Sequence, residues 1–398
     1  MSSGVRWLVA ASLGVLLLAA TSGAGSSTIS EYSGGISADS WLARIVAGPD
    51  GNLWFTELLG NRIGKITPAG VVTEYSRGIS PGSYPRGIAA GPDGNLWFTE
   101  SWGVGRITPA GVVKEYRAGF SSGPAQIAAG PDGNLWFTEL DRDQVGKITP
   151  AGVVTEYRTG INPDSAPFGI AAGPDGNIWF TESGGVAKIT PAGVVTEFSI
   201  RSGSSITAGP DGNLWFTAGD KVGKITPTGV ATDYRVGTDS GASAITAGPD
   251  GNLWFTELDG IGKVTPAGVV TEYRAGLTAY SARGGIAAGP DGNLWFTEES
   301  LDTIEKITPA GVVTAYSLGA ILAVAVRGKG RITGGGIRCP ARCWTRIASG
   351  PTLTLRASAA RGYRFAGWSG GCTGLDTCTI HPIATVKKII ATFRKRHS

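Results

Sequence analysis

The chain has 398 residues, a formal net charge of +4 and only two histidines. This length predicts two or three domains of ordinary size, although a repeat architecture can fill it with one large domain. Both histidines, His381 and His397, follow the repeats described below, so the composition excludes imidazole acid–base chemistry within those repeats.

The N-terminal residues are typical of a secretory signal peptide. Arg6 precedes the apolar run 7–20, and the small residues Ser22 and Ala24 stand where a signal peptidase would cut. The run is short for a membrane span, and no later segment is long enough to form one. We therefore expect a signal peptide over residues 1–25 and a secreted mature protein without a transmembrane span.

A ten-residue segment, Gly-Pro-Asp-Gly-Asn-Leu-Trp-Phe-Thr-Glu, recurs almost unchanged along the chain. Its seven copies start at residues 48, 91, 130, 173, 209, 248 and 289. A second motif follows each copy, as in Lys-Ile-Thr-Pro-Ala-Gly-Val-Val-Thr-Glu-Tyr at residues 65–75. The spacing is close to the length of one four-stranded propeller blade. The repeats predict an all-β fold, a seven-bladed β-propeller over residues 28–318.

The second repeat shows how one blade is expected to form. Its four strands are predicted at residues 86–90, 95–100, 105–108 and 112–116. Pro-Asp-Gly and Pro-Ala-Gly separate the first two and the last two strands, because proline presets φ and glycine accepts the positive φ of a tight turn. Large side chains alternate on both faces of the second strand, which indicates a sheet packed between two neighbouring sheets.

Closure of the ring has two candidate strands. Thr28–Ser33 resembles an isolated outer strand, yet the seventh repeat has its own outer strand at Val312–Tyr316. Eight candidates therefore compete for seven places. We favour pairing of the N-terminal strand with the last blade, with Val312–Tyr316 either displaced or forming an extra edge.

A site for one ligand must break the sevenfold repetition. The tight turns on one face are nearly identical from blade to blade, whereas the connections on the opposite face vary. Propellers commonly bind ligands at the mouth of the central channel. The candidate ligand-binding residues on this variable face are Trp41, Arg44, Tyr84, Arg86, Trp102, Gln126, Asp141, Asp143, Phe168, Asp220, Asp259, Tyr280, Arg283, Glu298 and Glu299.

A glutamate ends the second strand of six repeats, and Ala218 replaces it in the fifth. The six are Glu57, Glu100, Glu139, Glu182, Glu257 and Glu298. Carboxylates that converge near the channel would raise one another's pKa or hold a cation. The alternative is a hydrogen bond to a neighbouring backbone, repeated in each blade.

The pairing of a Trp-Phe-Thr-Glu strand with an Ile-Gly-Lys-Ile-Thr strand resembles the virginiamycin B lyase, or streptogramin lyase, family over residues 28–316. The resemblance implies a seven-bladed propeller that opens streptogramin B antibiotics by a magnesium-assisted elimination without water. It further implies a histidine just before the isoleucine of the first strand in the late blades, and a glutamate that ends a second strand.

The chain keeps this glutamate at Glu298, which is the candidate catalytic and Mg²⁺-binding residue. It lacks the histidines, because Ser243 and Gly284 stand at the two positions. A positioned acid–base group contributes about 10²–10⁴-fold to a rate. We therefore favour a non-catalytic ligand-binding or surface-interaction protein.

Two other functions stay open. One is a metal-dependent carbon–oxygen lyase acting on a streptogramin B-like cyclic ester, with Glu298, a metal ion, and Tyr280 or Asp259 as the base. The other is a purely structural envelope protein.

The C-terminal segment, residues 319–398, differs from the repeats. From Ala320 onward it holds fourteen Lys or Arg residues and one acid, Asp376, while the rest of the chain carries a charge of −9. All four cysteines, Cys339, Cys343, Cys372 and Cys378, are also here. Three disulfide pairings are possible; we favour the two local pairs over a zinc site, whose usual spacing differs.

The same segment resembles the divergent internalin-type bacterial repeat, on Gly328–Thr333, Gly362–Gly370, the paired cysteines and Ile389–Phe393. The resemblance implies a small β module. Its basic charge fits attachment to an anionic cell-wall polymer or membrane surface, or simple solvation. The expected partners are thus an unknown small molecule or a cell-envelope polymer, not nucleic acid, and we expect a monomer.

Overall fold

The computed structural model describes residues 36–37, 40–201, 203–236, 241–274, 277, 283–299, 302–316, 321–334, 337–340, 344–346, 353–370, 372–375, 377–380 and 387–396. The predicted signal peptide, the N-terminal strand Thr28–Ser33, Tyr280 and Cys343 lie outside these residues.

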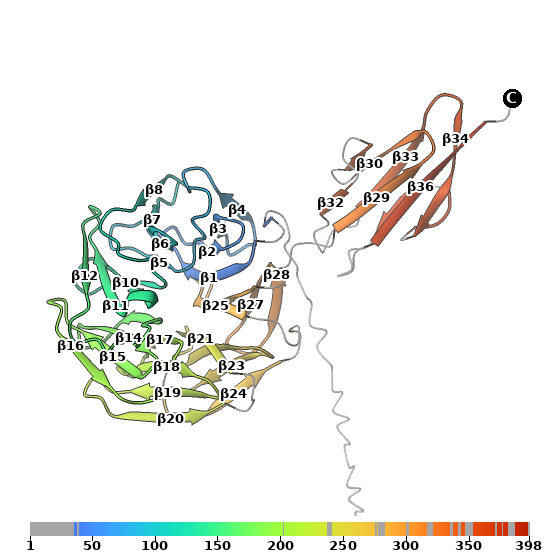
Figure 1. Cartoon of the computed structure of the whole chain (residues 1–398). Coiled ribbons are helices and arrows are strands. Elements are labelled where there is room, and N and C mark those ends of the chain that lie inside the picture. The colour runs from blue at the N-terminus through green and yellow to red at the C-terminus, as the bar shows by residue number, and fades with distance from the viewer. Residues whose placement is uncertain are drawn as a thin grey trace, which may run out of the picture.

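Seven four-stranded antiparallel sheets follow one another along the chain and form a ring (Figure 1). The blades are β1–β4 (Leu42–Ala47, Leu53–Glu57, Arg62–Ile66, Val72–Tyr75), β5–β8 (Ile88–Ala90, Leu96–Glu100, Gly103–Ile107, Val113–Tyr116), β9–β12 (Ile127–Ala129, Leu135–Glu139, Gln144–Ile148, Val154–Tyr157), β13–β16 (Ile170–Ala172, Ile178–Glu182, Gly185–Ile189, Val195–Phe198), β17–β20 (Ser205–Ala208, Leu214–Ala218, Lys221–Ile225, Ala231–Arg235), β21–β24 (Ala242–Ala247, Leu253–Glu257, Ile261–Val264, Val270–Tyr273) and β25–β28 (Arg283–Ala288, Leu294–Glu298, Thr303–Ile307, Val313–Tyr316). A short 3₁₀ helix, η1 (Leu140–Arg142), joins β10 to β11.

The repeated motif builds each blade through one local unit. In blade 1, the indole Nε1 of Trp54 donates to Asp50 in the preceding turn at 3.0 Å. Lys65 from the next strand lies over the Trp54 ring, 5.1 Å from its centroid, and 3.7 Å from the Asp50 carboxylate. Tyr75 of the outer strand stacks on the same indole at 5.5 Å. The residues of the repeated motif are therefore those that contact one another within a blade.

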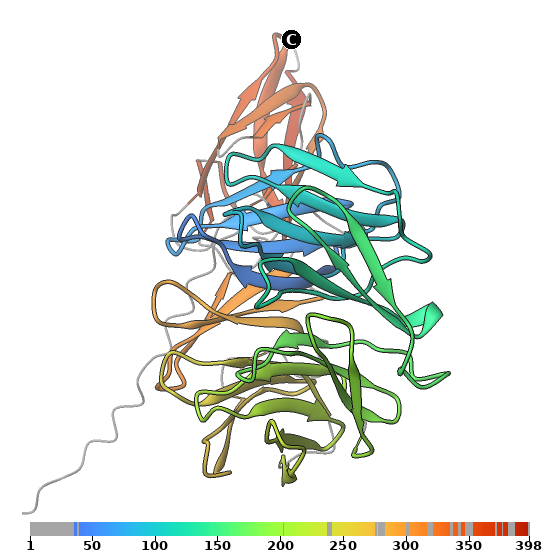
Figure 2. The ribbon, with the colours of Figure 1, turned by 90° about the vertical axis from the view of Figure 1, so that its left-hand side faces the viewer.

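The hydrophobic core lies between neighbouring blades. Trp54 of blade 1 packs with Phe98 of blade 2, and the equivalent pair recurs at every blade interface, including that of Trp295 in blade 7 with Phe55 in blade 1. All seven tryptophans at this position are fully buried. Burial of each ring stabilises the fold by a few kcal/mol at about 25 cal/mol per Å². The side view shows the blades as stacked twisted sheets (Figure 2).

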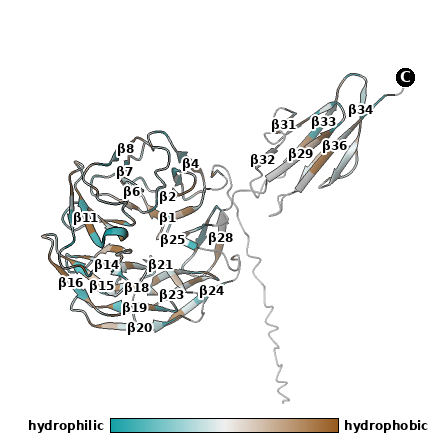
Figure 3. Ribbon diagram, viewed as in Figure 1, coloured by the Kyte–Doolittle hydropathy of each residue, from teal (hydrophilic) through white to brown (hydrophobic). Residues whose placement is uncertain are grey.

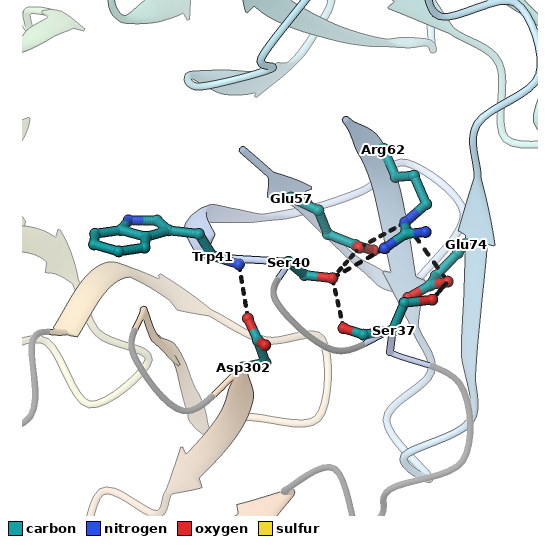
Figure 4. Close-up of polar contacts among 7 residues, drawn as sticks. All are labelled: Ser37, Ser40, Trp41, Glu57, Arg62, Glu74 and Asp302. Atoms are coloured by element: carbon teal, nitrogen blue, oxygen red, sulfur yellow. Dashed lines mark hydrogen bonds and ion pairs between the residues drawn. The ribbon is translucent and has the colours of Figure 1, made fainter. Parts of the chain in front are cut away.

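The ring closes by contacts between blades 1 and 7. The backbone N–H of Trp41 donates to Asp302 at 2.7 Å (Figure 4). Thr297 donates to the carbonyl oxygen of Ala43 at 3.3 Å. The outer strand of blade 7, β28, pairs with β27 in the ordinary register. The expectation that Val312–Tyr316 is displaced or forms an extra edge is therefore wrong, because this segment fills the same place as its equivalents in the other blades.

The C-terminal module consists of two four-stranded sheets (Figure 1). One has the order β32-β29-β36-β34 (Trp344–Arg346, Ile321–Arg327, Lys387–Lys395, Tyr363–Gly370), and the other β31-β30-β33-β35 (Ile337–Cys339, Gly330–Gly334, Leu353–Ala359, Cys378–Ile380). Hydrophobic stretches run along inner strands of the module as they do in the blades (Figure 3). Cys372 and Cys378 form the predicted disulfide, and Cys339 is also disulfide-bonded. In the described part of the chain, no helix has the length and hydropathy required to cross a bilayer.

Candidate functional site

Four of the predicted ligand-binding residues line one pocket. Tyr84, Arg86, Trp102 and Asp141 surround a hollow of ≈ 440 Å³ on the variable face between blades 2 and 3. Its other lining residues are Glu100, Ser101, Ser122, Gly123 and Pro124. Variable connections of two adjacent blades therefore line one concave pocket.

Two exposed aromatic rings stand at this pocket. Tyr84 is 47% exposed and Trp102 is 64% exposed. Tyr84 also has a left-handed backbone, with φ of 48°, and its N–H donates to the Asn61 side chain at 3.0 Å. A bulky residue in this conformation costs of order 1–3 kcal/mol, and such strain clusters at ligand-binding sites. The fold thus holds a large apolar ring toward solvent at a conformational cost.

Glu100 forms the buried wall of the pocket. Its side chain is 1% exposed, and the side chains of Glu115 and Ser83 lie beside its carboxyl group. Burial, together with the neighbouring Glu115 carboxylate, raises the pKa of Glu100 to about 8. The hydroxyl oxygen of Ser122 is buried without a hydrogen bond. A buried polar group without a partner is costly, so a ligand that bonds to the Ser122 hydroxyl gains free energy on binding.

The recurring glutamates lie inside their own blades. In blade 1, Glu57 accepts hydrogen bonds from Ser40 at 2.7 Å and from Arg62 at 3.0 Å (Figure 4). The neighbouring Glu74 on the outer strand accepts from both the N–H and the hydroxyl of Ser37. Burial and the outer-strand carboxylate raise the pKa of Glu57 to about 7.

The same pairing recurs in blades 2, 3 and 4. Glu139 and Glu182 lie beside outer-strand glutamates, and burial raises the pKa of each to about 7. The raised pKa values were predicted, but their cause is burial within each blade and not convergence at the channel. The sequence also offered a repeated backbone hydrogen bond to the glutamate that ends the second strand. In the structure the glutamate of the outer strand accepts such a bond instead, as Glu115 does from the backbone N–H of Ser80 at 2.6 Å.

Arg44 links blade 1 to blades 3 and 7. Its Nε donates to the Gln126 side chain of blade 3 at 3.3 Å, and its Nη1 donates to the carbonyl oxygen of Gly284 in blade 7. Burial is the main cause that lowers the pKa of Arg44, with the nearby Arg86 acting in the same direction and Glu299 opposing it. The predicted residues Arg44 and Gln126 therefore contact each other, and Arg44 also links blade 1 to the backbone of blade 7.

Blade 7 holds a buried charged cluster in place of the usual glutamate pair. Glu305 stands where blade 1 has Gly64, and Ala315 lies opposite it in place of the outer glutamate. Burial and the Glu298 carboxylate raise the pKa of Glu305 to about 8. Blade 7 therefore carries this carboxyl group on β27, whereas blade 1 carries it on the outer strand, β4.

Glu298 itself is 1% exposed, and both of its carboxylate oxygens accept a hydrogen bond. One oxygen accepts from Arg283 at 3.2 Å, and the other accepts from Thr303 at 2.9 Å. A divalent cation here would compete with the Arg283 guanidinium, and no group of three or more His, Cys, Asp or Glu side chains among the described residues is arranged to hold a metal ion. The surroundings of Glu298 do not fit the Mg²⁺ that the resemblance implied.

The two positions expected to carry imidazoles differ in surroundings. Ser243 is exposed, and its carbonyl oxygen accepts from Thr217 at 2.8 Å. Gly284 is buried at an irregularity in the pairing of β25 with β26. A Cβ atom at Gly284 would overlap the carbonyl oxygen of Ala43 and come within 2.8 Å of the Glu299 carboxylate. A side chain at this position would therefore require the Ala43 backbone and the Glu299 carboxylate to shift.

The remaining predicted residues lie apart from the pocket. Trp41, which is 43% exposed, stands at the junction of blades 1 and 7. Phe168 uses its backbone to link blades 3 and 4, and one oxygen of Asp259 is buried without a hydrogen bond. Asp143 accepts from two backbone N–H groups of the next connection, at Asp164 and Ala166.

Sequence reasoning missed Asn61 and Ser122 as parts of the site. Asn61 orients the Tyr84 backbone, and Ser122 contributes an unbonded hydroxyl to the pocket. Nothing in the sequence pattern separates them from other loop residues, because their position depends on the conformation of the connections.

Comparisons with known proteins agree with this geometry. Residues 24–205 and 200–328 match the model of the virginiamycin B lyase family, and residues 322–397 match that of the divergent InlB B-repeat domain. A streptogramin B lyase structure is 32% identical over 67% of this chain and 93% of its own, with a TM-score of 0.63.

Two structures from Staphylococcus aureus are similarly related. Virginiamycin B lyase is 35% identical over 67% of this chain and 94% of its own, with a TM-score of 0.62. A catalytically inactive histidine-to-alanine variant with quinupristin has the same identity and coverage and a TM-score of 0.63. No match was found among curated proteins. The family match and these identities over nearly the whole of the relatives establish that the chain belongs to the virginiamycin B lyase family.

Proposed function

We propose that this family member is a secreted ligand-binding propeller that does not carry out the lyase reaction. The observation that carries the proposal is the pair of positions Ser243 and Gly284, of which the second has no room for a side chain. An elimination requires a base for the proton and an acid for the leaving oxygen, each worth about 10²–10⁴-fold. Serine and glycine supply neither unaided.

The pocket between blades 2 and 3 supports binding. It combines the exposed rings of Tyr84 and Trp102 with the charged groups of Arg86 and Asp141 and the buried carboxyl of Glu100. Ligand sites are typically concave, with aromatic walls and a few polar groups that fix orientation. A flat ligand of small-molecule size that stacks on an aromatic ring and donates a hydrogen bond to Glu100 suits this arrangement.

A metal-dependent carbon–oxygen lyase is the alternative, favoured by the names of the relatives and by one structural feature. Asp259 has a buried oxygen without a hydrogen bond, and a carboxylate of this kind is a candidate base. In this alternative Tyr280 is the other candidate base, and Glu298 would have to release Arg283 to hold a metal ion.

A binding screen with purified full-length protein tests the proposal. Quinupristin and a panel of aromatic and saccharide ligands are titrated while the thermal midpoint is followed, and Trp102→Ala is compared with the control Trp41→Ala. Saturable stabilisation that Trp102→Ala alone abolishes supports the proposal. Turnover of quinupristin would favour the lyase, and the absence of any saturable shift would favour a purely structural envelope protein.

Secretion and domain division belong to the same proposal. The apolar run after Arg6, the disulfide Cys372–Cys378 and the InlB-type repeat support export. We place the propeller at residues 28–318 and the module at 319–398, as a monomer. Expression with residues 1–25 intact should deliver processed protein outside the cell, and protein that keeps these residues and stays inside would contradict export.

A further inference from the structure

One sheet of the C-terminal module presents arginines from three adjacent strands on the same face. In the β31-β30-β33-β35 sheet, Thr333 lies directly opposite Arg338 on one side and Arg356 on the other. Side chains directly opposite each other in a sheet share a face. Arg331, two residues before Thr333 on β30, points the same way. This set, Arg331, Arg338 and Arg356, is called the arginine face.

The arginine face is turned toward solvent. All three arginines are exposed, whereas the alternate residues Ile332 and Leu355 are fully buried in the module core. The sheet therefore separates a hydrophobic side from a charged side, as expected for a sheet that covers a core on one face.

The charges of this face are uncompensated. Among the described residues, none of the three arginines forms an ion pair with a carboxylate. The segment from Ala320 onward carries fourteen basic residues and one acid, Asp376. A cluster of positive side chains with no carboxylate paired to it attracts anionic groups.

The face is also hollowed. Arg331, Thr333 and Arg338 line a depression of ≈ 680 Å³ together with Gly334, Ile337, Cys339 and Pro340, whereas Arg356 lies outside this lining. The guanidinium fork donates two parallel hydrogen bonds to a phosphate or carboxylate group. The Thr333 hydroxyl adds a donor between the two arginines.

We propose that the arginine face binds a linear, phosphate-bearing polymer of the cell envelope. The arginines extend over about 10 Å from β31 to β33, at about 4.8 Å per strand, so successive phosphates of one polymer can engage them. Ser358, opposite Arg331, and Thr354 complete a polar surface on β33 without a large exposed apolar side chain. Apolar side chains that enter the bilayer strengthen binding to a membrane surface, and this face offers none among its described residues. The polymer is therefore favoured over a lipid surface.

The module supplies its own matched control. Arg364 and Arg394 lie directly opposite each other on β34 and β36, in the other sheet, and both are exposed. Replacing this pair removes the same charge from the same module without touching the arginine face.

The test measures binding of the full chain to inorganic polyphosphate at several salt concentrations. The double variant Arg338→Gln/Arg356→Gln should weaken binding about tenfold or more and reduce the dependence on salt, because two charge-assisted contacts are lost. Arg338→Lys/Arg356→Lys should recover part of the affinity. Arg364→Gln/Arg394→Gln should change affinity about threefold or less.

Equal losses in both glutamine variants would overturn the proposal in favour of diffuse electrostatic attraction. Binding of the unaltered chain to anionic phosphatidylglycerol vesicles but not to polyphosphate would overturn it in favour of a lipid surface. No binding to either probe would also overturn it. Thermal unfolding of each variant, compared with the unaltered chain, identifies any loss that comes from a misfolded module.

Discussion

Gly284 in blade 7 lies against the carbonyl oxygen of Ala43 in blade 1, with no space for a Cβ atom between them. The contact belongs to the ring-closing interface, where Thr297 also donates to the Ala43 carbonyl. Arg44 fixes the same peptide by donating to the Gly284 carbonyl oxygen. Gly284 stands where the family resemblance implies a histidine, and its backbone packs in the interface that closes the ring.

Gly284→His should destabilise the propeller by about 1–3 kcal/mol or more, because the new side chain must displace the Ala43 backbone or the Glu299 carboxylate. Ser243→His should change stability by about 0.5 kcal/mol or less, because Ser243 is exposed. Urea unfolding followed by tryptophan fluorescence measures both. Equal stability of the two variants would show that blade 7 can accommodate the side chain.

The free energy of unfolding should fall as the pH rises from about 4.5 to 8. Glu57, Glu100, Glu139 and Glu182 have raised pKa values of about 7 to 8, so the folded protein keeps protons that the unfolded chain releases near its ordinary pKa of 4.5. Each retained proton contributes a slope of about 1.4 kcal/mol per pH unit, present below the unfolded pKa and lost through the folded pKa.

Glu100→Gln should flatten this dependence and raise stability at pH 8 relative to the unaltered chain. Urea midpoints from pH 5 to pH 8.5 measure the effect, with Asp164→Asn, at an exposed carboxylate, as the control. Parallel stability curves for the two variants would mean that Glu100 does not titrate in this range.

The propeller could be predicted from the sequence because each blade repeats one self-contained set of contacts. The Trp54, Asp50 and Lys65 unit depends on residues close in sequence, and its recurrence determines the number of blades. The pocket could be predicted only as a set of variable loop residues. Whether Tyr84 and Trp102 share a site depends on backbone conformations such as the positive φ of Tyr84. The outer strand of blade 7 was mispredicted, because two segments had equally suitable sequences.

Arg283→Ala should cost about 3–5 kcal/mol of stability. The buried Arg283 neutralises Glu298, and Glu305 is also buried nearby, so its loss leaves carboxyl groups without the cation. Arg274→Ala is the matched control, because Arg274 forms an exposed ion pair with Glu272 at 2.6 Å. The control should cost about 1 kcal/mol or less. A similar small cost for Arg283→Ala would show that the buried cluster is neutral overall.

Trp102→Ala should leave stability within about 0.5 kcal/mol of the unaltered chain, because the ring is mostly exposed. It should nevertheless weaken any ligand of the pocket about tenfold or more, since stacking and apolar burial are both lost. Isothermal titration with the strongest ligand of the thermal screen measures this difference. Unchanged affinity would place the ligand elsewhere on the propeller.

The most direct test of the absent lyase chemistry is incubation of purified full-length protein with quinupristin and Mg²⁺. An elimination leaves the mass of the molecule unchanged, so liquid chromatography with tandem mass spectrometry must separate the cyclic and linear isomers. We predict that the ring stays closed throughout the incubation. Accumulation of the linear isomer, abolished by Glu298→Ala, would contradict the account.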